Sequence, residues 1–138
     1  MLGLKINQLA VGQKASFTKT ITETDVYLFA GISGDINPAH LNESYAKDTF
    51  FKGRIAHGML SASLISAVIG VQLPGPGTIY SSQTLKFLAP VRFGDTITAT
   101  VEITEIFPDK NRVALKTYCT NQDGTVVTTG EALVLPHK

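Results

Sequence analysis

The chain of 138 residues contains only one cysteine, no tryptophan and no long run of charge of one sign. A single thiol cannot close an intramolecular disulfide or build a zinc site from cysteines, so stability must come from an apolar core. Twelve lysines and arginines against eleven acids leave a net charge of +1, and these charges are scattered along the chain. Because there is no basic stripe, we expect no nucleic-acid partner.

Long apolar runs are also missing. The most apolar stretch, residues 59–73, is too short and too interrupted by serine and glycine to span a bilayer. Residues 1–8 lack the apolar centre of a signal peptide. Cys119 lies in a strand-like stretch, which predicts a buried structural thiol and fits a reducing compartment. We therefore expect a cytoplasmic protein that has no membrane partner.

The chain does contain enough apolar material for a single folded domain over residues 1–138. Its hydrophobic share is 43% and its charged share is 17%, a balance typical of folded proteins. Thr22 followed by Asp25 predicts a helix cap, and that helix should end near Gly34. Asn, Gln, Asp and Gly at residues 121–124 predict a hairpin turn. Further expected elements are strands at residues 14–21, 79–88, 96–106, 112–120 and 125–135, a short helix at 43–49 and a long helix at 57–71.

The long helix expected at residues 57–71 is apolar nearly all the way round. Leu60, Leu64 and Val68 share one face, while Ile65 covers another. A helix of this kind should be buried rather than laid on a surface. The strands that follow it alternate apolar and polar residues, which predicts an antiparallel sheet with one buried face. The expected fold is α+β, with a meander of four strands wrapped around the helix.

A short loop carries the residues best suited to chemistry, because Asp35, Asn37 and His40 fall within six consecutive positions. A carboxylate and an imidazole held this close can bind one water between them and exchange protons with it, the minimum for general acid–base catalysis. Pro38 restricts the loop and would preserve that geometry. The alternative is that Asp35 only caps a turn and that His40 lies on the surface, since such residues are common in turns.

His57 and Gly58 stand at the start of the long helix. Gly58 has no side chain, so a ligand oxygen could reach its backbone N–H at the positive end of the helix. Such a donor suits the enolate oxygen that forms when a thioester is attacked at its β-carbon. The alternative is that Gly58 only permits tight packing against the sheet. His57 is expected to orient other groups rather than to act as the base.

Asp35, His40 and His57 could alternatively bind a metal ion, although their spacing in the sequence is unusual for zinc. The sequence has no glycine-rich phosphate loop ending in lysine and serine or threonine, and no Gly-x-Ser-x-Gly elbow. The residues therefore favour acid–base chemistry on water over phosphoryl transfer or a serine nucleophile.

Together, the two motifs resemble the signature of the MaoC-like, (R)-specific enoyl-CoA hydratases. Residues 34–40 (GDINPAH) and 54–60 (RIAHGML) follow each other at the spacing of that family. The resemblance covers nearly the whole chain and is closest to the short, single-domain members that feed polyhydroxyalkanoate synthesis. It implies a hotdog fold, in which a curved antiparallel sheet wraps a long central helix and residues 22–56 overhang the sheet and carry the catalytic loop. Further matching stretches are 73–77, 85–87, 90–91, 94–95 and 130–132.

The resemblance implies a role for each matching position. Asp35 and His40 match the catalytic pair, which would hold the water that adds to C3 of a trans-2-enoyl-CoA and gives an (R)-3-hydroxyacyl-CoA. Asn37 matches a residue that supports the loop. Gly58 matches the N–H that holds the thioester oxygen, and Ser66 matches a serine behind the pair.

The resemblance also implies how substrate and subunits are arranged. Ile69 and Leu133 match positions near the acyl tunnel, with His57 beside the substrate, and their bulk favours short acyl chains. Family members need no metal and no organic cofactor. They are usually homodimers whose sheets join edge to edge, with the tunnel near the subunit boundary.

Other activities of the same fold stay open from the sequence. Thioesterases of this fold usually carry a carboxylate on the central helix, whereas Gly58 and the apolar Met59 stand there in this chain. A non-catalytic acyl-CoA-binding subunit is expected to have lost Asp35 or His40, and both are present. A dehydratase acting on another acyl-CoA, or on an acyl carrier protein thioester, would use the same pair.

Overall fold

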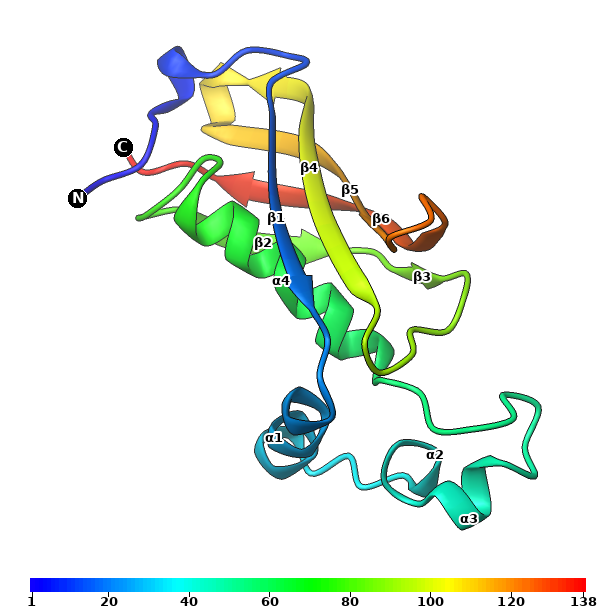
Figure 1. Ribbon diagram of the computed structural model, residues 1–138. Coiled ribbons are helices and arrows are strands. Elements are labelled where there is room, and N and C mark those ends of the chain that lie inside the picture. Colours follow the sequence, from blue (N-terminus) through cyan, green and yellow to red (C-terminus); the bar gives the residue numbers. More distant parts are fainter.

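The structure, a computed structural model, describes residues 1–138 as one antiparallel sheet with a long helix along one face (Figure 1). In chain order the elements are η1 (Ile6–Gln8), β1 (Lys14–Thr20), α1 (Glu23–Ser33), α2 (Pro38–Leu41), α3 (Glu43–Ala46), α4 (Gly58–Val71), β2 (Ile79–Gln83), β3 (Lys86–Phe87), β4 (Thr96–Phe107), η2 (Pro108–Lys110), β5 (Arg112–Thr120) and β6 (Val126–Leu135). The strand order is β1-β4-β5-β6-β2, and the short strand β3 also pairs with β6. The predicted α+β class is therefore confirmed.

The sheet forms because apolar and polar residues alternate along its strands. In β4, every second residue from Ile97 to Ile103 is buried and lies in the core. β5 repeats the pattern between β4 and β6. The turn predicted at residues 121–124 is confirmed, since the N–H of Asn121 donates to the carbonyl of Thr125 at 3.0 Å.

The strand order departs from the predicted meander of four strands. Only β4, β5 and β6 are sequential neighbours, whereas β2 lies at the far edge and pairs with β6. The single strand expected at residues 79–88 divides into β2 and β3 at Thr84, whose N–H donates to Glu131 (2.8 Å). The strand order was not predicted because alternation shows which face of a strand is buried but not which strand lies beside it.

The helix α4 is buried on one side only. Leu64 and Val68 face the core, where the helix lies against β4, β1 and β5. The sequence predicted a helix buried on all sides. In the single chain this prediction is wrong, because the sheet covers only one side of α4 and the other side is exposed. The open face of α4 consists of the exposed residues Met59, Ser63, Ser66, Gly70 and Val71.

Residues 22–56 form the overhanging segment that the family resemblance implies, and its helices α1 to α3 gather beyond the end where α4 begins (Figure 1). The predicted cap of α1 is confirmed. Thr22 accepts the N–H of Asp25 (3.1 Å), and Asp25 accepts the N–H of Thr22 (2.9 Å). Gly34 ends the helix in the left-handed region, with φ of 79°.

The loop predicted after Gly34 contains a helical turn, α2, that the sequence analysis did not foresee. Its N-cap is Asn37 and its first residue is Pro38, two residue types that favour a helix start as well as a turn. The helix expected at residues 43–49 is also shorter, because α3 ends at Ala46. No helix of the structure combines the length and the apolar character that crossing a bilayer requires.

Candidate active site

A cavity of about 390 Å³ opens where α4 begins, between the overhanging segment and β3. It contains both pairs of residues singled out in the sequence, Asp35 with His40 and His57 with Gly58. Most of its other lining is hydrophobic, as in small-molecule sites generally. The wall includes Phe50, Phe51, Phe87, Leu88 and Val91.

The helical turn α2 fixes the ring of His40. Asn37 caps this turn by accepting the N–H of Ala39 through Oδ1 (3.0 Å). The imidazole of His40 is buried, and its Nδ1 lies 2.7 Å from the carbonyl oxygen of Ile55. A carbonyl can only accept, so Nδ1 carries the proton and Nε2 keeps a lone pair. The surface alternative for His40 is therefore wrong, and the ring is arranged to act as a base through Nε2.

Asp35 lies on the loop between α1 and α2. Its Oδ1 accepts the N–H of Asn37 (3.2 Å), and its own N–H donates to the hydroxyl of Ser33 (3.1 Å). These contacts are those of a turn-forming aspartate. They leave Oδ2 without a hydrogen bond in the chain, on a residue that borders the cavity. Asp35 can thus stabilise the turn and still present an oxygen for chemistry.

The two candidate catalytic groups lie close enough together for one water to bridge them. Asp35, His40 and His57 each offer one oxygen or nitrogen atom, and these atoms all lie within 4.8 Å of one another. Two hydrogen bonds of about 2.8 Å that meet at one water oxygen span about 4.6 Å. The carboxylate of Asp35 and the imidazole of His40 can therefore share a water molecule.

His57 joins the two catalytic candidates from the start of α4. It is only 2% exposed, and its Nε2 lies 2.9 Å from the backbone carbonyl of Asp35, so Nε2 carries the proton. Its ring stacks on that of His40, with centroids 3.8 Å apart, and tilts against Phe29 at 4.9 Å. The Nδ1 atom of His57 is buried and has no partner. These contacts with Asp35 and His40 are compatible with the expected orienting role of His57, which stays a prediction.

The same three residues do not fit a zinc site well. Each imidazole already donates one ring N–H to a backbone carbonyl, through His40 Nδ1 and His57 Nε2. The remaining lone pairs lie in the planes of two rings stacked at an interplanar angle of 29°. Lone pairs of stacked rings do not converge on one point, whereas zinc needs its nitrogen ligands at about 2.0–2.1 Å in tetrahedral directions. The geometry favours the water-binding interpretation.

Gly58 is the first residue of α4. The structure supports both interpretations of it, as a backbone donor to a ligand oxygen and as a residue that permits tight packing. Its N–H has no acceptor in the chain, as expected at a helix start, and the residue lines the cavity. A Cβ atom here would lie only 2.6 Å from the ring of Phe87. Close packing therefore requires glycine, and the same absence of a side chain leaves the N–H open to a ligand oxygen.

Ser66 and Ile69 are not part of the cavity. Ser66 lines a separate hollow and makes no hydrogen bond to Asp35 or His40, so the expected position behind the pair is not observed. Ile69 is buried in the core rather than at a cavity wall.

Leu133 lies on the wrong side of the sheet for an acyl tunnel around α4. Its neighbours Ala132 and Val134 face the core, and side chains alternate along a strand. Leu133 borders a hollow on the outer face instead, beside its partner Ala114 on β5. The structure thus places Leu133 on the face away from α4, because a one-residue difference in strand phase inverts the face and the sequence pattern did not settle it.

A second hollow of about 480 Å³ runs between the open face of α4 and β2. Met59 lines both this hollow and the cavity, so the two spaces are neighbours with Met59 between them. Tyr80 donates its hydroxyl to Gln83, and Gln83 donates to Thr117 (2.8 Å). Burial raises the pKa of Tyr80 to about 12, so its hydroxyl stays protonated at neutral pH.

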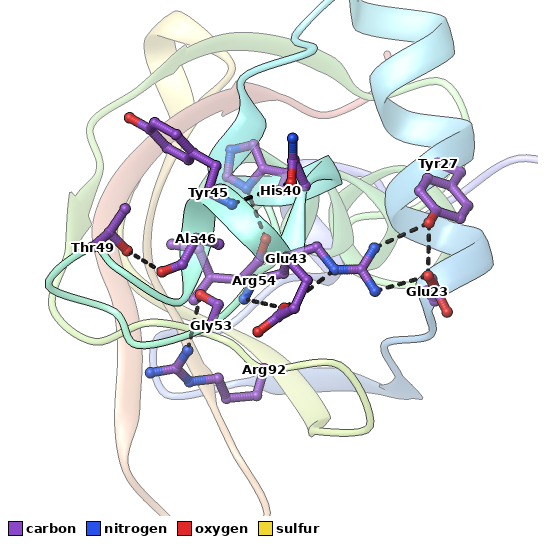
Figure 2. Close-up of polar contacts among 12 residues, drawn as sticks. Glu23, Tyr27, His40, Glu43, Tyr45, Ala46, Thr49, Gly53, Arg54 and Arg92 are labelled. Atoms are coloured by element: carbon purple, nitrogen blue, oxygen red, sulfur yellow. Dashed lines mark hydrogen bonds and ion pairs between the residues drawn. The ribbon is translucent and has the colours of Figure 1, made fainter.

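Arg54 connects the overhanging helices to the segment before α4, as Figure 2 shows. It donates through Nη2 to Glu23 (2.9 Å), through Nη1 to the hydroxyl of Tyr27 (3.0 Å) and through its backbone N–H to Glu43 (3.1 Å). Hydrogen bonds from Tyr27 and then from Arg54 hold the pKa of Glu23 below its usual range. The network therefore ties α1 and α3 together.

Neither Arg54 nor Ile55 was among the functional residues expected from the sequence. Ile55 follows Arg54 directly, and its carbonyl fixes the protonated nitrogen of His40. The arginine network thus helps to hold the acceptor on which the state of the His40 ring depends. One arginine and two distant acids give no local signal, so the sequence alone could not reveal this arrangement.

Comparison with known proteins shows a family and relatives that agree with the geometry of the cavity. The MaoC like domain matches residues 7–127. An (R)-specific enoyl-CoA hydratase of Rhodospirillum rubrum is 62% identical over 124 residues, which cover 90% of this chain and 85% of the relative. The hydratase of the same name from Aeromonas caviae is 45% identical over 131 residues, covering 95% of this chain and 98% of the relative.

Two solved structures are similar over nearly the full chain. The unliganded R-hydratase of Pseudomonas aeruginosa gives a TM-score of 0.93 at 51% identity, covering 99% of this chain and 87% of that one. The Aeromonas caviae (R)-hydratase, described as involved in polyhydroxyalkanoate biosynthesis, gives 0.90 at 46% identity, covering 93% and 97%.

Proposed function

Because the chain belongs to the MaoC-like domain family and has the hotdog fold of its (R)-hydratases, we propose that it catalyses the reversible, (R)-specific hydration of trans-2-enoyl-CoA to (R)-3-hydroxyacyl-CoA. The protein is then a hydro-lyase, and an acyl-CoA thioester is its substrate. The observation that carries this proposal is that Asp35 and His40 line one cavity and offer atoms no more than 4.8 Å apart, close enough for one water to bridge them.

In the hydration direction the pair activates that water. As the water oxygen bonds to C3, one of its protons passes to the pair and the double bond shifts toward an enolate. A proton from the pair then closes the reaction at C2, so atoms and charge balance. Asp35 Oδ2 and His40 Nε2 are the two unoccupied proton acceptors, and a positioned acid–base group of this kind accelerates a reaction by about 10²–10⁴-fold.

The enolate oxygen needs a donor, and the N–H of Gly58 provides it in this proposal. It has no acceptor in the chain and lies at the positive end of the 14-residue helix α4. A single pair that handles both proton transfers works on one face of the substrate. Addition of water is therefore syn. The (R) configuration requires in addition that the water attacks one particular face of C3, and the names of the (R)-specific relatives support that face here.

The acyl chain is proposed to pass Met59, which borders both spaces, and to occupy the hollow along the open face of α4. That hollow lies beside β2, the strand at the edge of the sheet. A second copy of the chain that pairs at this edge would cover the open face and close the hollow into a tunnel. We therefore propose a homodimer with its tunnel at the subunit boundary, acting in the cytoplasm and supplying polyhydroxyalkanoate synthesis.

The experiment that tests the proposal is incubation of the purified protein with crotonyl-CoA. We expect loss of the enoyl absorbance without release of free thiol, and (R)-3-hydroxybutyryl-CoA as the product on chiral analysis. Release of thiol would identify a thioesterase, and an unchanged substrate would contradict the assignment. Parallel assays with longer enoyl-CoAs and with the crotonyl ester of acyl carrier protein would define the range of substrates.

A further inference from the structure

The loop of residues 47–54 presents an apolar ring to solvent at the edge of the cavity. Phe50 lines the cavity and is nevertheless 90% exposed, the largest exposure of any phenylalanine in the chain. Its neighbour Phe51 meets it edge to face, with ring centroids 5.7 Å apart, and also lines the cavity. Folding gains little from an exposed ring, so what sets Phe50 apart from other exposed apolar residues is its place at the cavity.

The loop is not exposed because it is loose. Thr49 donates its hydroxyl to Ala46 (2.6 Å) and accepts the N–H of Phe51 (3.3 Å). Arg92, from the loop before β4, donates to the carbonyls of Phe51 (2.5 Å) and Gly53 (3.4 Å). Figure 2 shows the hydrogen bond from Thr49 to Ala46 and the one from Arg92 to Gly53. The backbone is therefore fixed on both sides of the exposed ring.

Positive charge accompanies the ring. Lys47 and Lys52 are exposed and outnumber the one acid of the segment, Asp48. The ion pairs of the structure involve Lys19 and Arg54 as the cations, so both of these lysines are free. Lys52 has a positive φ of 59°, an uncommon conformation for a residue other than glycine. An exposed aromatic ring beside free cations is a surface suited to a base and its phosphates.

The position of the loop suggests which part of the substrate meets it. The proposed function puts the thioester at Gly58 and the acyl chain beyond Met59, in the second hollow. The acyl end of the substrate is thereby assigned a position. The other arm must leave the cavity past its remaining lining, which includes Phe50 and Phe51. In an acyl-CoA that arm ends in adenosine phosphates.

We propose that residues 47–54 bind the adenosine phosphate part of CoA, with the ring of Phe50 against adenine and the ammonium group of Lys52 near a phosphate. The proposal rests on the proposed function, since it takes an acyl-CoA as the substrate. It makes the loop the feature that distinguishes a CoA ester from a simple thioester.

The test compares Phe50→Ala with the unchanged protein on two substrates, crotonyl-CoA and crotonyl N-acetylcysteamine, which lacks the nucleotide. Loss of one stacked base is expected to raise KM for crotonyl-CoA about tenfold and to leave kcat within about twofold. The value of kcat/KM for the short ester should not change. Lys52→Glu should raise KM for crotonyl-CoA in the same way and weaken its dependence on salt.

The matched controls are Ile32→Ala, which removes another highly exposed apolar side chain, and Lys110→Glu, which reverses a charge elsewhere. Both should leave the two substrates unaffected. Equal losses on both esters in Phe50→Ala, or no loss on either, would overturn the proposal.

Binding of free CoA, measured by calorimetry, tests the loop without any turnover. We expect Phe50→Ala to weaken binding about tenfold. Unchanged affinity, or no binding to the original protein, would overturn the role of the loop. A protein that binds CoA through Phe50 but hydrates neither ester would instead refute the proposed function while the loop assignment survives.

Discussion

The imidazole of His57 lies face to face with that of His40, with the ring centroids 3.8 Å apart and the planes inclined by 29°. The same His57 ring donates through Nε2 to the backbone carbonyl of Asp35. One buried side chain therefore sets the position of both residues that we assign to proton transfer. It does so from the start of α4, next to the N–H proposed for the substrate oxygen.

The first prediction concerns this positioning role. His57→Phe keeps a ring to stack on His40 but removes the donor to Asp35, whereas His57→Gln keeps an N–H donor near the position of Nε2 but removes the ring. Each should lower kcat at least about tenfold, because an unpaired buried acceptor or a lost contact costs on the order of 1–3 kcal/mol. Steady-state assay with crotonyl-CoA gives the result, and circular dichroism controls for folding. Full activity in both variants would exclude a positioning role.

The second prediction separates the two roles of Gly58. Gly58→Ala introduces a Cβ that would meet the ring of Phe87 at 2.6 Å, so the variant should be less stable and less active. Adding Phe87→Leu to it makes room for that Cβ. Thermal melts of the double variant should show recovered stability, while kcat/KM stays low because the oxygen site remains crowded.

Recovery of activity along with stability would show that Gly58 serves packing alone. The single variant Phe87→Leu is the control, since it retains the glycine and its free N–H. Its kcat should stay close to that of the original protein.

The third prediction follows from the outward direction of Leu133. Leu133→Ala should leave the ratio of kcat/KM for crotonyl-CoA to that for octenoyl-CoA unchanged, because the side chain borders a hollow on the far face. Ser66→Leu, in the hollow along α4, should lower the rate with the longer substrate, by a selectivity change on the order of 1–3 kcal/mol per added group. The opposite pattern would restore the assignment made from the sequence.

The fourth prediction concerns Cys119, which is fully buried with its Sγ 3.5 Å from the carbonyl of Ser61. Burial raises the pKa of its thiol to about 12 from an ordinary value of 9.0. Thiol reagents at pH 8 should therefore label it only after unfolding. Above pH 9 the unfolded thiol ionises and the folded one does not, so its contribution to the free energy of unfolding decreases as pH rises toward 12.

Comparison with Cys119→Ala isolates that contribution from other groups that titrate in the same range. The variant should show a shallower loss of stability between pH 9 and 12, measured by urea unfolding. Rapid labelling of the folded protein at pH 8 would contradict the burial of this thiol.

Local patterns in the sequence predicted the elements well and their partners poorly. The Thr22 and Asp25 cap, the turn at residues 121–124 and the start of α4 all depend on residues close in the chain, and all are present. The edge position of β2 and the open face of α4 depend on which strands pair with each other. The alternation of apolar and polar residues does not predict strand pairing.

The candidate site shows the same division. Asp35 and His40 were identified because they share one loop, and the structure brings them to one cavity with His57. The tautomer of His40 depends on Ile55, fifteen residues away, and the exposure of Phe50 depends on contacts with Arg92. The face on which Leu133 lies depends on the register of β6, and a shift of one residue would turn the side chain to the other face of the sheet.

The most direct test of the account measures hydration of crotonyl-CoA by Asp35→Asn and by His40→Gln, two substitutions of similar size that remove the proton acceptor. Both variants should fold like the original protein and should lose at least about 100-fold in kcat, the usual effect of removing an acid–base group. Turnover at the original rate by either variant would show that no water is activated between these two side chains.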